Sequence, residues 1–454
     1  MSLVSLFRRR WQRLAVVSIV FCAVSLSILS TQEESKHDDE PSELQMKFPL
    51  LWEHVHISNG TGGAWYIPPE WLPESQPTPE TIVDAAQLAF KLANSTTHRS
   101  ISHSEIPLIV HQTWKNTDID TWPETICDSV EKWLDFVVDT PMAYFLWDDD
   151  GVFQFLEKFD PGFIGEFSSL PANVERSDVF RILVLNYIGG IYGDVDTHPL
   201  RSPATWIVPS DLMPWYDPET GASYNSTGPV KAVFGLEADC PPDSDSYWRM
   251  GYTHPVQLTQ WALAAAPGHP VLSRFMDNLS HRLQEVASRH GGNLTSASAF
   301  RELQRLDPLV LTGPAALTVS AKSWLEESAG LRWNALTGLH DGGKSKLVDD
   351  VMILPITGFS PGRGVYGNMG SKPTTDPDAR LLHHAQGSWK SFNLRVEFGK
   401  FCRTFFGLCK DWSKRSRTAQ ATLNEEGHSG EDEGSFMSFT LSSTRWDMLR
   451  EKET

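Results

Sequence analysis

The sequence predicts an α/β fold in which helices cover both faces of a Rossmann-like, mostly parallel sheet. Two observations lead to this prediction. Short apolar runs, typical of buried strands, alternate along the chain with longer segments of helical periodicity. A pair of carboxylates, Asp194 and Asp196, directly follows one of these runs, at the end of a strand where such sheets bind ligands. The middle of the chain is therefore expected to form one globular domain.

The expected elements follow from periodicity and from helix and turn signals. Buried strands are expected at 106–110, 143–147, 191–195 and 230–236. Helices are expected at 125–138, 151–158, 174–187 and 269–288. The helix at 174–187 should end at Gly189, which serves as its C-cap.

Asp194 and Asp196 form an Asp-x-Asp motif after the run Gly-Gly-Ile-Tyr-Gly. On an extended strand, the period of two would point both carboxylates to one face, with Val195 on the other. Hard oxygen ligands of this kind suit Mn²⁺ or Mg²⁺, which in turn bridges a diphosphate. Spacing alone also allows a solvated turn, so the surrounding sequence decides the interpretation.

The helix before this motif is apolar on most of its circumference but carries Glu175, Asp178 and Arg181 on one stripe. Buried charges are costly unless they are paired or functional. An internal pair between Asp178 and Arg181 that locks the helix is one interpretation. The position of the stripe, immediately before the strand-end carboxylates, favours a site instead.

Several motifs in a fixed order resemble glycosyltransferase family 32, the DxD-containing sugar transferases, and in particular their fungal α-1,6-mannosyltransferase branch. The resemblance spans about 106–390. Besides the Asp-x-Asp region, it is carried by IPLIVHQTWK at 106–115, YFLWDDD at 144–150, FGLEAD at 234–239, Gln260-Trp261, PGHP at 267–270, Thr312-Gly313-Pro314, His383-His384 and GSWK at 387–390.

The resemblance implies a glycosyltransferase-A fold and a metal-dependent, retaining mannosyltransferase. It further implies that GDP-mannose is the donor, that an N-linked glycan receives mannose in α-1,6 linkage, and that a mannosyltransferase complex is a candidate partner. Two alternatives stay open. One is an inositol-phosphoceramide mannosyltransferase, and the other is a non-catalytic sugar-binding subunit, which intact carboxylates disfavour.

The resemblance also assigns roles to individual residues. Asp196 is expected to ligate Mn²⁺ or Mg²⁺, and Asp194 is expected to contact the metal or the donor ribose. Asp178 and Arg181 match an Asp-x-x-Arg motif that implies contacts to the donor sugar and phosphate. His384 resembles a C-terminal metal or diphosphate ligand, although the adjacent His383 could exchange roles with it.

Two further groups are candidates for ligand binding. His111, Gln112 and Trp114 follow the first strand, where a doubly wound fold places nucleotide contacts, although core packing accounts for Trp114 equally well. Glu237 and Asp239 form another alternating pair at a strand end and are candidates for acceptor binding. In contrast, the run Asp148–Asp150 lacks the ligand spacing of a calcium loop and is better explained as a turn that caps the next helix.

Charge and the chain ends suggest the compartment. The formal net charge of −18 argues against nucleic acid as a partner. Arginines precede the uncharged apolar stretch 14–30, and acidic residues follow it, as in a signal anchor of the positive-inside type; a cleaved signal peptide is the alternative. The prediction is a single-pass type II Golgi membrane protein with a cytosolic tail (1–13), anchor (14–30), lumenal stem (31–100), catalytic domain (101–412) and disordered tail (413–454).

The cysteines and the glycosylation motifs fit a lumenal domain. Cys127, Cys240, Cys402 and Cys409 lie beyond the anchor and suggest two disulfides of undetermined connectivity, with buried free thiols as the alternative. N-glycosylation is expected at five N-x-Ser/Thr motifs. These are Asn59, Asn94, Asn225, Asn278 and Asn293.

Overall fold

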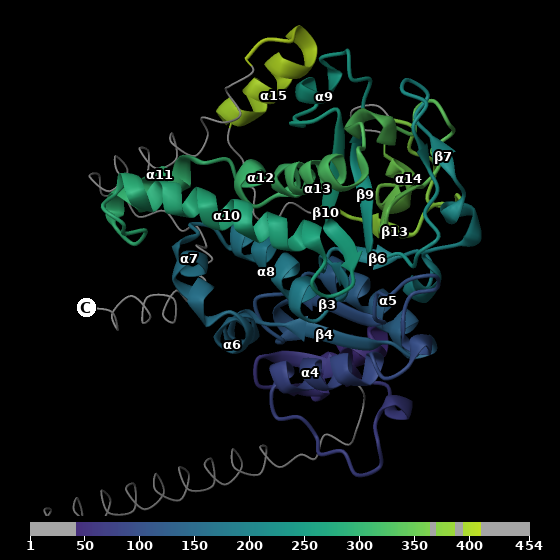
Figure 1. Cartoon of the computed structure of the whole chain (residues 1–454). Coiled ribbons are helices and arrows are strands. Elements are labelled where there is room, and N and C mark those ends of the chain that lie inside the picture. The colour runs from purple at the N-terminus through teal and green to yellow at the C-terminus, as the bar shows by residue number, and fades with distance from the viewer. Residues whose placement is uncertain (1–41, 364–368, 386–393, 410–454) are drawn as a thin grey trace, which may run out of the picture. The chain divides into compact units, whose positions relative to one another are not determined.

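A computed structural model describes residues 42–363, 369–385 and 394–409 (Figure 1). The chain divides into two compact units, 1–47 and 48–454. The described part of the first unit holds the short helix α2 (Glu43–Lys47). The fold and the site described below belong to the second unit. The expected anchor, the GSWK motif at 387–390 and the expected C-terminal tail lie outside the described residues.

The predicted location in a Golgi membrane is wrong on the structural finding. Across the described ranges, no helix is both long enough and apolar enough to cross a bilayer. The stretch 14–30, from which the location was inferred, is not among those ranges.

A nine-stranded sheet in the order β1-β2-β4-β3-β5-β10-β9-β12-β11 forms the centre of the described fold. β3, β4, β5, β9 and β12 run in one direction, whereas β2, β10 and β11 run in the opposite direction. This arrangement confirms the predicted α/β class with a mostly parallel sheet. The strands are β1 (Asn59–Gly60), β2 (Gly63–Tyr66), β3 (Ile109–Thr113), β4 (Ala143–Trp147), β5 (Gly190–Gly193), β9 (Ala232–Asp239), β10 (Val256–Ala265), β11 (Lys346–Val348) and β12 (Val351–Leu354). Two small sheets pair β6 (Thr197–Pro199) with β13 (Leu381–His383) and β7 (Trp215–Tyr216) with β8 (Ser223–Tyr224).

Helices cover both faces of the central sheet (Figure 1). α5 connects β3 to β4, and α8 lies on the connection from β4 back to β5. These two crossovers run in opposite directions along the strand order, so right-handed connections place their helices on opposite faces. The helices are α3 (Pro49–Leu51), α4 (Ile82–Ala93), α5 (Glu124–Asp139), α6 (Asp149–Phe159), α7 (Ile164–Ser169), α8 (Asn173–Tyr187), α9 (Ser246–Arg249), α10 (Pro270–Arg289), α11 (Ala297–Arg305), α12 (Pro308–Leu311), α13 (Pro314–Ala329), α14 (Ile356–Phe359) and α15 (Leu394–Phe406).

The local turn chemistry agrees with the sequence in two places. The Asp148 side chain accepts a hydrogen bond from the Gly151 amide at 2.8 Å and caps α6, as predicted. After α8, Gly189 and Gly190 take φ values of +77° and +111°. A Cβ at Gly190 would collide with the backbone carbonyl of Ile109 on β3, so only glycine lets β5 enter the sheet here.

The segment that the sequence analysis treated as a stem is folded from residue 48 onward. β2 pairs with β4 in the central sheet, and α4 packs against β2, β3 and β4. The Thr81 side chain caps α4 by accepting a hydrogen bond from the Asp84 amide. The Pro-rich composition around 68–79 suggested a spacer, but Trp71 within this segment and Ile82 just after it are buried.

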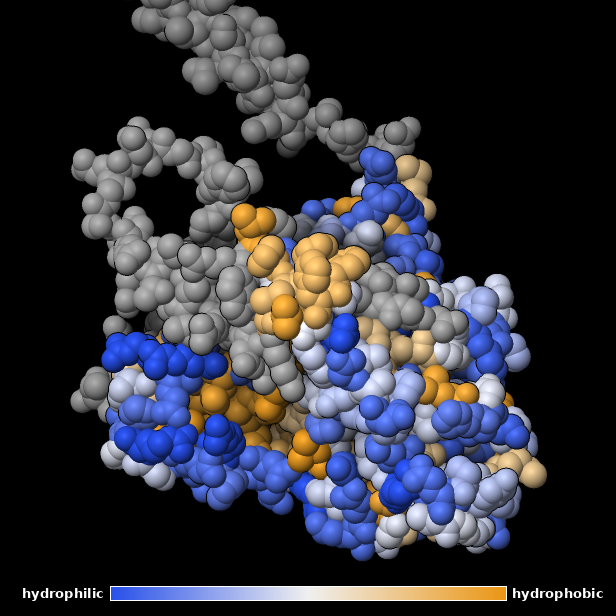
Figure 2. All heavy atoms as spheres, turned by 90° about the horizontal axis from the view of Figure 1, so that it is seen from above, coloured by the Kyte–Doolittle hydropathy of each residue, from blue (hydrophilic) through white to orange (hydrophobic). Residues whose placement is uncertain are grey.

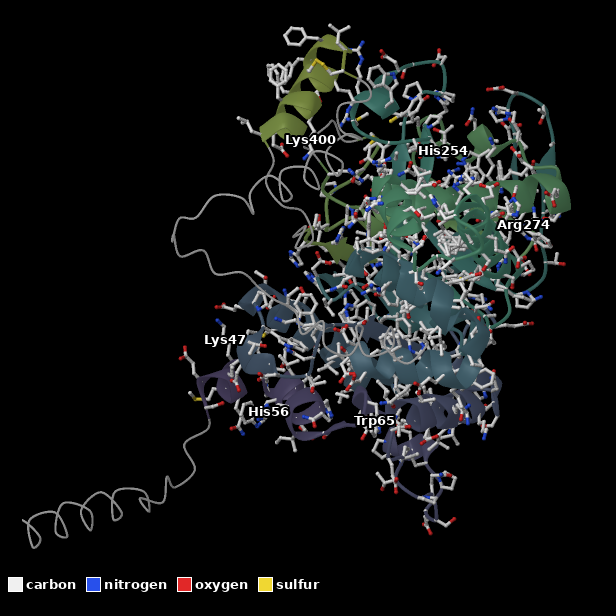
Figure 3. The ribbon with its side chains drawn as sticks, turned by 90° about the vertical axis from the view of Figure 1, so that its left-hand side faces the viewer. Lys47, His56, Trp65, His254, Arg274 and Lys400 are labelled. Atoms are coloured by element: carbon white, nitrogen blue, oxygen red, sulfur yellow. A yellow bond between two sulfur atoms is a disulfide. The ribbon has the colours of Figure 1, made fainter. Side chains whose placement is uncertain are left out.

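Helix packing around α10 and α15 completes the described fold. Arg274, labelled in Figure 3, projects from α10 and binds both carboxylate oxygens of Glu327 on α13 at 2.7 Å. α15 contacts α9 and leaves Phe398, Phe401 and Phe405 exposed. Figure 2 shows apolar side chains gathered on the face that carries this helix.

Cysteines and sequons differ partly from expectation. Cys402 and Cys409 form a disulfide, whereas Cys127 and Cys240 are buried free thiols, so the two-disulfide prediction is wrong for the second pair. All five sequon asparagines are exposed. However, Asn278 lies within α10 and its side-chain amide donates to Ser320 on α13, so a glycan there would break an interhelical contact.

Candidate active site

The Asp-x-Asp motif forms a tight turn rather than the end of an extended strand. β5 stops at Gly193, and the Thr197 amide donates to the Asp194 carbonyl at 2.9 Å to close the turn that leads into β6. The Asp194 amide donates to the Trp261 carbonyl of β10 at 2.8 Å. The turn therefore sits at the carboxyl end of the parallel strands, which is the ligand-binding edge of such sheets.

Asp194, Asp196 and His383 converge at this turn. One ligand atom from each side chain lies within 4.8 Å of the others, and the His383 Nε2 is 3.4 Å from Asp196 Oδ1. The three side chains are between 16 and 27 % exposed, so the cluster is recessed but open to solvent. Two carboxylate oxygens and one imidazole nitrogen form a donor set that fits Mn²⁺ or Mg²⁺ and leaves positions for phosphate oxygens or water.

The histidine at the cluster is His383, whereas the resemblance pointed to His384. β13 pairs antiparallel with β6, and His383 lies opposite Thr197. Because successive side chains in an extended segment point to opposite faces, His384 turns away from the carboxylates. Its Nε2 lies 2.9 Å from the His198 Nδ1 instead. Of the two histidines that the sequence left open, the strand register thus brings His383 to the carboxylates in this structure.

Arg181 connects the helix α8 to the Asp-x-Asp turn. Its Nη1 lies 2.9 Å from Asp178 Oδ1, and its Nη2 lies 2.9 Å from Asp194 Oδ1. Nη1 also donates to the Gln260 carbonyl at 3.1 Å, and the guanidinium lies over the Tyr192 ring. Its side chain is 6 % exposed, so Arg181 orients Asp194 from behind the cluster.

Asp178 is the buried anchor of this arrangement. Its second carboxylate oxygen accepts a hydrogen bond from Thr312 Oγ1 at 3.0 Å, at the start of the Thr-Gly-Pro motif. Burial raises the pKa of Asp178 to about 7, and the Arg181 guanidinium opposes this rise. Burial likewise raises the pKa of Asp194, again against the influence of Arg181. The internal pair expected on the α8 stripe is therefore present, and through Arg181 it extends to Asp194 of the cluster.

The third charged residue of the stripe, Glu175, has a local role. Its Oε2 accepts a hydrogen bond from the Ala172 amide at 2.8 Å and so satisfies a free backbone donor at the start of α8.

His111 and Gln112 are fully buried and support the sheet rather than face a ligand. The His111 Nδ1 accepts from the Trp147 indole at 3.2 Å, and its Nε2 lies 3.1 Å from the Gly189 carbonyl. Burial lowers the pKa of His111 to about 3, so the ring is neutral. The Gln112 amide donates to the carbonyls of Gly193 and Asp194 at 3.3 and 3.2 Å. This geometry does not support the prediction that His111 and Gln112 contact the donor. Both side chains are buried, and both form hydrogen bonds with backbone carbonyls at the two ends of β5.

Trp114 lies just beyond β3 and is half-buried. Its ring packs edge-on against Trp122 with centroids 6.3 Å apart. Its indole nitrogen is buried without a hydrogen-bond partner in the protein. Among His111, Gln112 and Trp114, Trp114 is therefore the residue whose side-chain donor has no partner in the described part of the chain.

The predicted acceptor pair is separated by the structure. Asp239 is buried and accepts hydrogen bonds from Thr337 Oγ1 at 2.6 Å and from the Gly338 amide at 2.8 Å, so it holds a loop. Glu237 is half-buried on β9 and accepts from the Gln257 side-chain amide at 3.1 Å, so the two carboxylates have different partners. Only Glu237 remains a candidate for acceptor binding.

Comparisons with known proteins agree with this geometry. Residues 123–213 match the family described as "Glycosyltransferase sugar-binding region containing DXD motif". The chain is 35 % identical over 225 residues to the initiation-specific α-1,6-mannosyltransferase of Schizosaccharomyces pombe, and the match covers 49 % of each chain. It is 27 % identical over 302 residues to the protein of the same name from Candida albicans, covering 63 % of this chain and 72 % of that one.

Shorter or weaker likenesses accompany these matches. The inositol phosphoceramide mannosyltransferase 3 of S. pombe is 38 % identical over 108 residues, which cover 22 % of this chain and 29 % of that one. The solved structure of the PaToxG glycosyltransferase covers 56 % of this chain and 83 % of its own at 16 % identity, but its TM-score of 0.28 supports no argument. The region that contains Asp194 and Asp196 therefore matches the DXD-containing sugar-binding region of glycosyltransferases, and the chain is similar to α-1,6-mannosyltransferases over about half of its length.

Proposed function

We propose that this protein is a metal-dependent, retaining mannosyltransferase that moves mannose from GDP-mannose to an N-linked glycan in α-1,6 linkage. The observation that carries the proposal is the convergence of Asp194, Asp196 and His383 at the carboxyl edge of the sheet. The names of the similar proteins support mannose as the transferred sugar and an α-1,6 linkage.

The roles of the residues follow from their positions. Asp196 and His383 would hold a divalent cation together with Asp194, whose carboxylate Arg181 keeps in place. A bound cation of this kind neutralises the charge that develops on a departing diphosphate. Trp114, just beyond the end of the neighbouring strand β3, would donate its indole N–H to the donor nucleotide. Glu237 would face the acceptor from β9.

Retention of configuration normally raises the question of a protein nucleophile. Among the described residues near the cluster, the carboxylates Asp178 and Asp194 are both engaged by Arg181, and Asp196 lies beside His383. We therefore propose same-face attack, in which the acceptor hydroxyl gives its proton to the leaving phosphate while these carboxylates stay in place.

The test is a transfer assay on the full chain with GDP-mannose, other nucleotide sugars, an N-glycan acceptor and inositol phosphoceramide, each with and without Mn²⁺. We expect transfer from GDP-mannose to the N-glycan that depends on the cation. Asp196→Asn should abolish both transfer and the thermal stabilisation by Mn²⁺, because the amide keeps the size of the side chain but removes its charge.

Asp128→Asn is the matched control, because Asp128 is half-buried on α5, outside the Asp194–Asp196–His383 cluster, and its carboxylate forms an ion pair with Lys132. This variant should keep wild-type transfer. Full activity and metal response in Asp196→Asn would contradict the assignment of the cluster. Transfer to inositol phosphoceramide alone would redirect the proposal to a lipid acceptor.

A further inference from the structure

An irregularity in β10 brings this strand into contact with several parts of the cluster. The pairing of β10 with β9 shifts register between Leu258 and Leu263, so the intervening residues leave the regular ladder, as in a β-bulge. Bulges of this kind redirect side chains and are frequent beside active sites. Within the bulge, the Gln260 carbonyl accepts a hydrogen bond from Arg181, and the Trp261 carbonyl accepts one from the Asp194 amide.

The Trp261 side chain contacts the histidine of the cluster. Its ring stacks on His383 with centroids 4.5 Å apart and an interplanar angle of 24°. Its indole N–H donates to the Phe359 carbonyl at 3.4 Å, which fixes the plane of the ring against α14. One residue thus contacts Asp194 through its backbone and His383 through its side chain.

His383 needs such support because its own strand is short. β13 has three residues and pairs with β6 on one edge within the described part of the chain. The imidazole lies 3.4 Å from Asp196, and the indole covers one of its faces. Groups that orient a metal ligand are typically worth 10- to 100-fold in metal affinity.

We propose that Trp261 is a positioning residue that holds the His383 imidazole in the orientation required for a divalent cation. This inference rests on the proposed function, because it concerns the same cluster. The stack keeps the edge of the His383 imidazole directed at Asp196. The irregular segment of β10 places the indole beside the Asp-x-Asp turn. Trp261 itself contributes no ligand atom to the cation.

The test is a Mn²⁺ titration of the full chain in the absence of substrate, in which electron paramagnetic resonance measures the bound and free cation. Trp261→Leu removes the ring but leaves the backbone carbonyl that binds Asp194. We expect Mn²⁺ affinity to fall at least tenfold in this variant. Trp261→Phe keeps a stacking ring without the indole N–H and should stay within about threefold of the wild type.

Trp215→Leu is the matched control. Trp215 stacks on Tyr224 with centroids 4.4 Å apart and donates its indole N–H to the Leu347 carbonyl, but it lies in the separate β7–β8 sheet. It loses the same kind of contacts and should keep wild-type Mn²⁺ affinity. A general loss of stability would lower affinity in both Trp→Leu variants and would overturn the proposal.

A double variant separates positioning from any other effect of the indole. In a His383→Ala background, Trp261→Leu should cause no further loss of Mn²⁺ affinity, because there is no imidazole left to orient. An additional tenfold loss in that background would overturn the proposal. If Trp261→Leu kept wild-type Mn²⁺ affinity while Asp196→Asn abolished binding, the role of Trp261 would be refuted but the metal site would stand. Absence of Mn²⁺ binding by the wild-type chain would refute both this role and the metal site of the proposed function.

Discussion

At the residue scale, the decisive feature is one buried guanidinium between two carboxylates. Arg181 contacts Asp178 and Asp194 at 2.9 Å each, so the charge of the helix pair is shared with the cluster. The resemblance implied that this arginine contacts the donor. In the structure, contacts within the protein satisfy the buried Arg181 side chain without a ligand. A substitution of Arg181 should therefore affect stability as well as turnover.

We expect Arg181→Lys to lower both stability and turnover. A lysine keeps the positive charge but has one nitrogen, so it loses the fork that joins Asp178, Asp194 and the Gln260 carbonyl. The loss should be about 2–3 kcal/mol of unfolding free energy, below the cost of removing a buried charge outright. Turnover of the folded fraction should fall at least tenfold. Urea unfolding and the transfer assay measure the two effects.

Arg176→Lys on the same helix provides the comparison. Arg176 makes hydrogen bonds with the exposed Asn173 side chain and with the Leu170 carbonyl, and a lysine there should cost less than about 1 kcal/mol. If Arg181→Lys kept wild-type stability while turnover vanished, Arg181 would act on the donor directly, as the resemblance implied.

The buried imidazole of His111 predicts a pH dependence of stability. Its pKa is lowered to about 3 by burial, whereas an unfolded histidine titrates near 6.5. Between about pH 6.5 and pH 3, His111 is therefore protonated in the unfolded chain but neutral in the folded chain. Its contribution to stability is complete above about pH 6.5 and is lost, at about 1.4 kcal/mol per pH unit, as the pH falls toward 3.

The measurement compares wild type with His111→Gln in urea at pH 7 and pH 5. The variant should be less stable at pH 7, because it loses a fitted side chain between Trp147 and the Gly189 carbonyl. Its stability should then fall by about 2 kcal/mol less than that of the wild type between the two pH values. Parallel pH curves would show that His111 is not neutral in the folded chain.

At the element scale, the turn between α8 and β5 places the Asp-x-Asp motif. After α8 the chain reverses direction through Gly189 and Gly190 and enters β5. β5 ends at Gly193, so Asp194 follows directly at the ligand-binding edge of the sheet. The Gln112 side chain on β3 donates hydrogen bonds to the carbonyls of Gly193 and Asp194 at the end of β5. The position of the cluster therefore depends on a close approach between β5 and β3.

Gly190→Ala should be strongly destabilising. The residue has a φ of +111°, and an added Cβ would collide with the Ile109 carbonyl of β3. We expect a loss of about 3 kcal/mol or more, since strain and a backbone clash add. Gly268→Ala is the control, because Gly268 also has a positive φ, +70°, but nothing within 4 Å of an added Cβ. That variant should lose about 1 kcal/mol. Equal losses, read from chemical unfolding, would mean that the approach of β5 to β3 is adaptable.

At the scale of the whole molecule, the two buried thiols report on whether the fold opens as a unit. Cys127 lies on α5 and Cys240 follows β9, and both side chains are 1 % exposed. Burial raises the pKa of Cys127 to about 11 and also raises that of Cys240. Both thiols should therefore be unreactive in the folded chain.

A thiol titration with a chromogenic disulfide reagent checks this expectation in a Cys22→Ser variant. We expect no reactive thiol in the native state, two in denaturant, and four after reduction of the Cys402–Cys409 disulfide. Cys127 and Cys240 should become reactive at the same denaturant concentration if the central sheet unfolds cooperatively. Two separate transitions would show that α5 or the end of β9 opens on its own.

Local sequence patterns were sufficient to predict the α/β class, the helices α5, α6, α8 and α10, and the place of the Asp-x-Asp motif. They succeeded where an element is strongly apolar or carries its own cap, as in β4, in α8 with Gly189, and in α6 with Asp148. These signals are short-range, because hydrophobic periodicity and caps lie within a few residues of the element that they define. The same locality explains why the family motifs could be recognised in order along the chain.

Tertiary structure alone decided which side chains face the cluster. The choice of His383 over His384 depends on the register of β13 with β6, which joins positions almost 200 residues apart, and a shift of one residue would reverse it. The inward role of Gln112, the anchoring of Asp178 by Thr312 and the stack of Trp261 on His383 are likewise contacts between distant segments. The sequence determined which apolar, well-capped segments form elements and which residues are candidates for the chemistry, whereas long-range register and burial determined which of those residues meet.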